Sequence, residues 1–177
     1  MTTQPLFALI KSDLLRLSGY EYPDTAPRIW KYAFNPRFFP VLLFRFGRYC
    51  YMSKWLKLLS PLFSWLNVIL FGIEITSRCE IGAGLMIPHS VGIVIGATKI
   101  GNNATIFQGV TLGAANLDLA FDAALRPQLG DYVTIGAGAK VLGGIMIGDH
   151  VTVGANAVVL TSLDANTVAV GIPARPL

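Results

Sequence analysis

From Ile75 onward, aliphatic residues recur at every sixth position of the chain. Gly, Asn, Asp and Ala, which tolerate tight turns, fill many of the places between them. Each hexad therefore predicts a short strand followed by a corner. One hexad cannot bury its own apolar positions, so three should form a triangular coil and stacked coils should share one core. The recurring positions are 75, 81, 87, 93, 100, 106, 112, 129, 135, 141, 147, 153 and 159.

A second apolar position usually follows four residues after the first. Val91 fills it in the third hexad, and small or aliphatic residues fill it in most of the others. The register breaks by one residue before Ile100 and by a longer insertion before Leu129. We expect this insertion, at about residues 114–128, to project from a corner as a loop with a functional role.

The first part of the chain has a helical pattern instead. Residues 5–18 place Leu6, Ile10, Leu14 and Leu17 on one face, and Gly19 predicts the end of this helix. The aromatic-rich stretch up to residue 71, with several prolines, predicts two or three further helices. The sequence therefore predicts a mainly β protein with an α-helical N-terminal region at 1–71 and a β-helix at 72–177.

Charge is unevenly distributed in this 177-residue chain of net charge +4. Residues 1–60 hold nine Lys or Arg against three acids, without the interleaved pattern of a nucleic-acid surface. We expect no nucleic-acid partner, and we expect the basic, aromatic helices either to touch an anionic membrane or to pack beneath an oligomer. The apolar run at 56–73 is split by Pro61 and is too short to span a bilayer. The sequence shows no signal peptide and no disulfide framework, so we expect a cytoplasmic protein. The alternative is a cytoplasmic protein that contacts the inner face of the membrane.

Six segments between residues 72 and 175 together resemble a known family. They are GIEI, IGAGLMIPHSVGIVIG, GVTLGA, IGAGAKVLGGIMIG, VGANAVV and VGIPAR. The chain resembles the hexapeptide-repeat acyltransferases with a left-handed β-helix, and within them the serine acetyltransferase branch. The resemblance implies a homotrimer that uses acetyl-CoA as co-substrate, in a groove between subunits, and needs no metal.

The resemblance also assigns roles to particular residues. His89 matches the family's catalytic base, and Glu74 matches the acid that orients it. Arg175 matches a basic residue near the CoA phosphates. The residues matching the small residues along the CoA groove are Gly113, Ala114, Gly136, Ala137, Gly154 and Ala155.

The chemistry of these residue types agrees with the assignment. A hydroxyl group is a poor nucleophile at neutral pH, so acetyl transfer from a thioester needs a base that removes the proton as the C–O bond forms. His89 lies in the one hexad where Pro and His replace the usual turn residues, whereas His150 occupies an ordinary corner and should be structural. Arg126, in the inserted loop, could hold an anionic acceptor group or be a solvated loop residue. Cys50 and Cys79 are expected to be packing residues.

Two departures from the serine acetyltransferase pattern bear on the acceptor. Pro88 replaces an aspartate of the family that binds the amino group of serine, and Leu125–Arg126 replaces an Arg-His pair. The short N-terminal region looks like that of exopolysaccharide and capsule acetyltransferases. We therefore expect a sugar hydroxyl of polysaccharide biosynthesis as the acceptor.

Other functions stay open at this stage. The chain could acetylate free serine in cysteine biosynthesis, acetylate the amino group of a nucleotide sugar, or be a non-catalytic structural solenoid. A zinc-dependent hydratase would need three histidines, and the chain has two.

Overall fold

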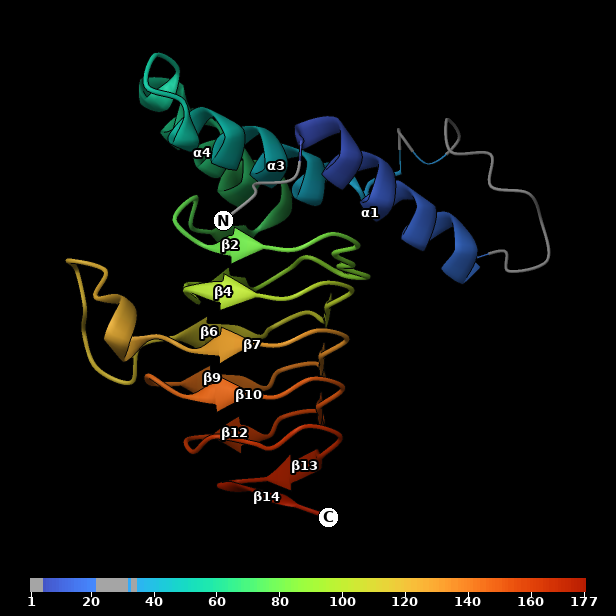
Figure 1. Ribbon diagram of the computed structural model, residues 1–177, viewed down its shortest axis with the longest axis vertical. Coiled ribbons are helices and arrows are strands. Elements are labelled where there is room, and N and C mark those ends of the chain that lie inside the picture. Colours follow the sequence, from blue (N-terminus) through green and yellow to red (C-terminus); the bar gives the residue numbers. More distant parts are fainter. Residues whose placement is uncertain (1–4, 22–31, 33–34) are drawn as a thin grey trace.

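The hexads form a left-handed parallel β-helix with three sheets, which confirms the predicted fold class (Figure 1). The computed structural model describes residues 5–21, 32 and 35–177. From β3 to β11, successive strands visit sheets A, B and C in turn, so each sheet stacks strands from successive coils. Sheet A holds β1 (Ile73–Ile75), β3 (Ile93–Ile95), β6 (Thr111–Gly113), β9 (Lys140–Leu142) and β12 (Val158–Val159); sheet B holds β2 (Glu80–Ile81), β4 (Lys99–Ile100), β7 (Gln128–Leu129) and β10 (Met146–Ile147). Sheet C holds β5 (Thr105–Ile106), β8 (Thr134–Ile135), β11 (Thr152–Val153), β13 (Val168–Gly171) and β14 (Ala174–Pro176).

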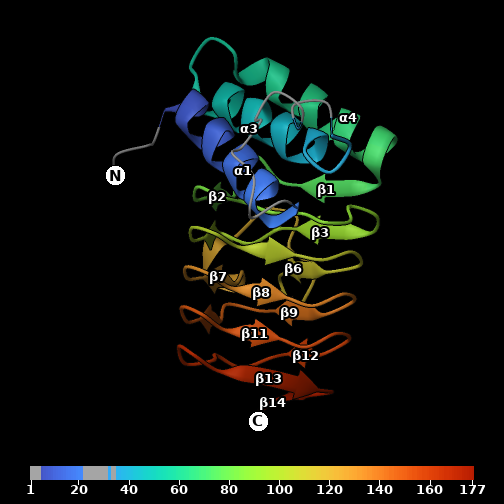
Figure 2. The same cartoon turned by 90° about the vertical axis from the view of Figure 1, so that its right-hand side faces the viewer.

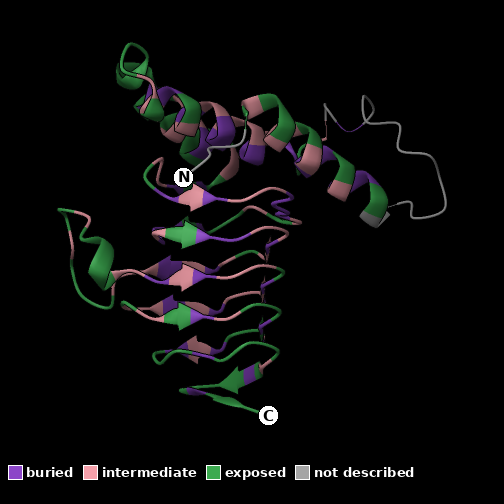
Figure 3. Cartoon of the chain, viewed as in Figure 1, coloured by how far each residue is buried: buried purple, intermediate pink, exposed green. Residues whose placement is uncertain are grey.

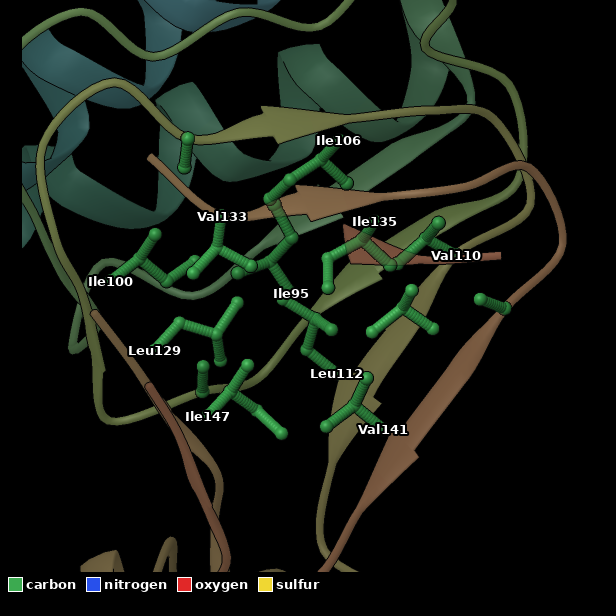
Figure 4. Packing of buried hydrophobic residues seen from close by; sticks show 14 of the residues in the cluster. Ile95, Ile100, Ile106, Val110, Leu112, Leu129, Val133, Ile135, Val141 and Ile147 are labelled. Atoms are coloured by element: carbon green, nitrogen blue, oxygen red, sulfur yellow. The ribbon is translucent and has the colours of Figure 1, made fainter. Parts of the chain in front are cut away.

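The predicted hexad positions point into the solenoid and form one continuous core (Figure 4). Ile95, Leu112, Ile135 and Val141, from three successive coils, are buried in this core. Val91 is the exception: it was predicted to point inward but is 71% exposed. Its corner turns at Ser90, where the N–H group of Ile93 donates to the Ser90 carbonyl (3.3 Å), and this turn directs Val91 outward.

Each coil has three corners, which we name by the sheets that they join. The corners from sheet C back to sheet A comprise residues 88–92, 107–110, 136–139 and 154–157. Main-chain hydrogen bonds link them from coil to coil: the N–H groups of Gly109, Gly138 and Asn156 donate to carbonyls of the preceding coil (2.8–3.0 Å). These corners therefore form one straight column along the solenoid, here called the C–A column.

The helices cover the N-terminal end of the β-helix (Figures 1 and 2). They are α1 (Leu6–Glu21), α3 (Phe39–Met52), a 3-10 turn η1 (Lys57–Leu59) and α4 (Ser60–Phe71). Leu14 and Leu17 of α1 are buried, as predicted, but Gly19 does not end the helix, which continues to Glu21. In the described part of the chain, no helix is long and apolar enough to cross a membrane.

A buried ion pair joins the helices to the β-helix. Asp13 of α1 accepts hydrogen bonds from Arg45 Nε (2.8 Å) and Nη2 (3.0 Å), and Arg45 also donates to the Ile81 and Gly82 carbonyls (2.6 Å each). The Leu85 N–H group donates to Asp13 (2.8 Å). Burial raises the pKa of Asp13, and the Arg45 guanidinium partly offsets that shift. Because every partner is satisfied, this cluster fixes α1 and α3 onto the first coils.

Candidate active site

His89 lies at the head of the C–A column, directly beside the end of α4. α4 ends at Phe71, and the next residue, Gly72, caps it in the left-handed conformation (φ 60°). The Gly72 carbonyl then accepts from the Gly92 N–H group (2.9 Å), and Ser90 Oγ donates to the Phe71 carbonyl (3.2 Å). The junction of helix and solenoid thus holds the corner on which His89 is exposed to solvent.

Glu74 lies on the outer face of β1, one coil from His89. It pairs in register with Val94 of β3 and is exposed, because its neighbours Ile73 and Ile75 take the inward positions. Within the described residues, neither the Glu74 carboxylate nor the His89 ring makes a hydrogen bond or an ion pair. The structure therefore brings the two segments together without joining the two side chains.

Four of the predicted CoA-groove residues continue the C–A column beyond His89. Gly136 and Ala137 follow β8, and Gly154 and Ala155 follow β11 on the next coil. The Gly136 and Gly154 N–H groups are used in the ladder, donating to Val153 and Ala169 (2.8 Å each). Among the described residues, the N–H groups of Ala137 and Ala155 donate to no protein acceptor, so they are available to a ligand.

Gly113 and Ala114 lie at the opposite edge of sheet A from His89. The Gly113 carbonyl accepts from the Gly143 N–H group (2.9 Å), and a Cβ atom added at Gly113 would meet nothing within 4 Å. Within one chain, Gly113–Ala114 and the C–A column therefore lie at opposite edges of sheet A. Arg175 of β14 is exposed at the far end of the solenoid, opposite Val170 of β13, whose side chain contacts the Gly154 position.

Arg126 organises the inserted loop, which projects from the side of the solenoid (Figure 1). Its guanidinium donates to Asp118 Oδ2 (2.9 Å), the Asp118 carbonyl (3.0 Å) and the Gly96 carbonyl (2.9 Å), and it lies 4.0 Å from the centre of the Phe121 ring. Two of its five N–H groups thus hold the loop together, and a third ties the loop to the solenoid at Gly96. That it also binds an anionic acceptor stays a prediction.

The other candidate side chains have structural surroundings. His150 stacks on Tyr132, with ring centres 4.8 Å apart. Cys79 is fully buried, and burial raises the pKa of its thiol to about 12, so it cannot supply a thiolate near neutral pH. In the described part of the chain, no group of three or more His, Cys, Asp or Glu side chains could hold a metal ion.

Lys140 is a residue beside this site that the sequence pattern did not indicate. It lies on the outer face of β9, half-buried, and its Nζ donates to the Gly109 carbonyl in the C–A column. The only signal in the sequence was a charge at an outward position of a hexad. A groove lies between α1, α3 and sheet B, and none of the predicted site residues line it.

Comparisons with known proteins show similarity in sequence and fold. Residues 126–161 match the family model "Bacterial transferase hexapeptide (six repeats)". A serine acetyltransferase of Helicobacter pylori is 41% identical over 107 residues, which are 60% of this chain and 61% of the relative. Among solved structures, a soybean serine acetyltransferase complexed with serine superimposes with a TM-score of 0.84 at 30% identity, and a serine acetyltransferase complexed with CoA does so with 0.82 at 30% identity. Both alignments cover 97% of this chain and 69% of the other chain.

The sequence alignments cover only part of these relatives. The chain spans between about half and three fifths of the length of the curated relatives that it matches at 39–50% identity. The helical region and the β-helix both fall within the structural alignments.

Proposed function

Because the chain belongs to the family of bacterial hexapeptide-repeat transferases, we propose that it is an acetyl-CoA-dependent O-acetyltransferase that acts on the hydroxyl group of serine. The observation that carries this proposal is an exposed imidazole, His89, at the head of a column of small residues with available N–H groups. Related proteins with this fold are serine acetyltransferases, and two of their structures hold CoA and serine respectively.

The prediction of a sugar hydroxyl in polysaccharide biosynthesis is wrong. The curated relatives, at 39–50% identity, are serine acetyltransferases, and so are the structural neighbours. The prediction gave too much weight to the short N-terminal region, although the structural similarity extends over 97% of the chain, helices included. It also relied on Pro88 and Leu125, two single positions beside a matching scaffold.

In the proposed reaction, His89 acts as the general base. Its ring accepts the proton of the serine hydroxyl while the oxygen attacks the carbonyl carbon of the thioester. The C–O bond forms, the C–S bond then breaks, and the imidazolium returns the proton to the departing thiolate of CoA. Main-chain N–H groups at the glycine-rich corners stabilise the negative charge on the carbonyl oxygen, so no covalent enzyme intermediate is needed.

We assign Glu74 a positioning role. A carboxylate beside the imidazole would fix its tautomer and stabilise the imidazolium. Support comes from the main-chain hydrogen bond between Gly72 and Gly92, which holds the two segments side by side. Both side chains are exposed and free to rotate toward each other when substrate binds.

Acetyl-CoA is assigned to the C–A column. The available N–H groups of Ala137 and Ala155 suit the amide carbonyls of the pantetheine arm, and small residues let it lie close to the backbone. Arg175, at the end of the column, suits the CoA phosphates, because guanidinium pairs with phosphate oxygens in bidentate fashion. Gly113 and Ala114 would complete this groove only from another copy of the chain.

We infer a homotrimer built on the outer face of sheet A. Sheet C presents outward the threonines of β5, β8 and β11 and also Val168 and Val170 of β13. Sheet B presents Glu80, Lys99, Gln128 and Met146. The outer face of sheet A carries four apolar side chains, Val94, Leu142, Val158 and Leu160, beside Thr111 and the charged Glu74 and Lys140. This face has the C–A column at one edge and Gly113–Ala114 at the other, so packing around a threefold axis would place His89 of one copy beside Gly113 of the next.

Two buried free cysteines, Cys50 and Cys79, support a reducing compartment such as the cytoplasm.

An acceptor assay tests the proposed function. Purified protein is mixed with acetyl-CoA and either L-serine, a nucleotide sugar or a free hexose, and the acetylated product is identified by mass spectrometry. We expect O-acetylserine, an ester that hydroxylamine cleaves. No product with serine, or a hydroxylamine-resistant amide on a nucleotide sugar, would contradict the proposal.

A further inference from the structure

Figure 3 shows exposed residues along α4 and the turn before it, and the exposed residues from Leu58 to the end of α4 are apolar and uncharged. Leu58, Leu62, Trp65 and Ile69 follow one another at helical spacing along the exposed side, and Leu58 is 93% and Trp65 70% exposed. Between Leu58 and Ile73 the sequence has no charged residue. We call these four side chains the α4 face.

The polar residues of α4 point inward, which is the reverse of an ordinary surface helix. Asn67 is 1% exposed and donates from Nδ2 to the Pro40 carbonyl (3.0 Å). Ser60 is also buried, and its Oγ bonds to Ser77 Oγ (2.9 Å). These contacts fix the rotation of the helix, so the apolar side is held toward the outside. An apolar patch that is held toward the outside indicates a surface that binds another protein or a membrane.

The charges around the α4 face are of one sign. From residue 25 to residue 73 the sequence has seven Lys or Arg and no Asp or Glu. Lys54 and Lys57 are exposed at the start of the face, and their Nζ atoms lie 6.0 Å from the Trp55 ring and 5.2 Å from the Tyr51 ring. Lysines next to the exposed Trp55 and the half-buried Tyr51 suit the level of lipid headgroups, where tryptophan and tyrosine also gather.

We propose that α4 and the preceding turn bind the surface of an anionic phospholipid bilayer. The α4 face enters the boundary between headgroups and acyl chains, and Lys54 and Lys57 contact the lipid phosphates. The helix, about 18 Å long, is too short to cross the bilayer and lies on it.

Charge favours the membrane over a second copy of this chain. Two α4 faces in contact would bring together lysines that have no acidic partner in this part of either chain, whereas an anionic bilayer supplies the opposite charge. This inference does not depend on which hydroxyl compound is acetylated.

Flotation of the full-length protein with vesicles tests the proposal. One vesicle preparation is phosphatidylcholine alone, and the other contains about one third phosphatidylglycerol. We expect the protein to float with the anionic vesicles rather than with phosphatidylcholine alone. High salt should release most of it, because salt screens the attraction between lysines and lipid phosphates.

Two variants separate the apolar and the charged contributions. Trp65→Ser with Ile69→Ser should abolish flotation, whereas the control Leu117→Ser with Leu119→Ser, on equally exposed positions of the inserted loop, should leave it unchanged. Lys54→Gln with Lys57→Gln should weaken binding to anionic vesicles by roughly twenty-five-fold, at about five-fold for each lysine. Thermal unfolding of each variant checks that the fold is intact.

The same samples show which result overturns the proposal. Absence of flotation by the unaltered protein, or flotation that the α4 substitutions leave unchanged, would rule the membrane out. If the α4 substitutions instead lower the mass measured by light scattering, the face is covered by another copy of the chain.

Discussion

At the scale of the residue, the sequence pattern indicates burial well and side-chain partners poorly. Ile81, Ile106 and Val153 are buried where the six-residue period predicts, because an inward position is set by the strand alone. Val91 breaks the pattern because a turn in its own corner redirects it. The link between Lys140 and Gly109 joins residues of different coils, so no local pattern could have predicted it.

Replacing Asp13 with Ala should lower the free energy of unfolding by about 3–5 kcal/mol. The change leaves the buried Arg45 guanidinium without its counter-charge. Urea denaturation measures the loss. Lys11→Ala, at an exposed position of the same helix, is the control and should change stability by less than about 0.5 kcal/mol. An equal effect of the two substitutions would contradict the structural role of the ion pair.

At the scale of the element, the strands follow from the repeat, whereas ends and insertions do not. Gly19 was predicted to end the first helix, but the helix continues beyond it, since glycine within a helix costs only about 1 kcal/mol. The break before Leu129 predicted a loop. Its internal packing of Arg126, Asp118 and Phe121 depends on contacts that the break itself cannot specify.

Two glycines of the coils should respond differently to substitution. Gly113→Val adds a side chain where nothing lies within 4 Å, so the fold should keep its stability while the KM for acetyl-CoA rises about ten-fold through obstruction of the proposed groove. Gly138→Ala, at φ +74° and against Asn156, should instead lower stability by about 1–3 kcal/mol. Steady-state kinetics and thermal unfolding distinguish the two effects. An unchanged KM in Gly113→Val would place the groove elsewhere.

At the scale of the whole molecule, the repeat identifies the solenoid but not the acceptor or the assembly. Acceptor choice depends on a few side chains at a corner, and single positions such as Pro88 proved to be a poor guide. The assembly depends on the relative polarity of three outer faces, which becomes visible only when the strands have been assigned to sheets.

If sheet A forms the trimer interface, Leu160→Glu should convert the trimer to monomers. A carboxylate placed in an apolar interface loses its hydration without gaining a partner. Met146→Glu, at a similarly exposed outward position of sheet B, is the control and should remain trimeric. Light scattering coupled to gel filtration measures the mass. A trimer that survives Leu160→Glu, or dissociates with Met146→Glu, would place the interface on another face.

The most direct test of the account compares the two histidines. The rate of acetyl transfer from acetyl-CoA to L-serine is measured for His89→Ala and His150→Ala, with circular dichroism as a check of the fold. Loss of the general base should lower kcat by about 10²–10⁴-fold in His89→Ala, whereas His150→Ala should stay close to the unaltered protein. A folded His89→Ala protein that turns over at the unaltered rate would show that His89 is not the catalytic base.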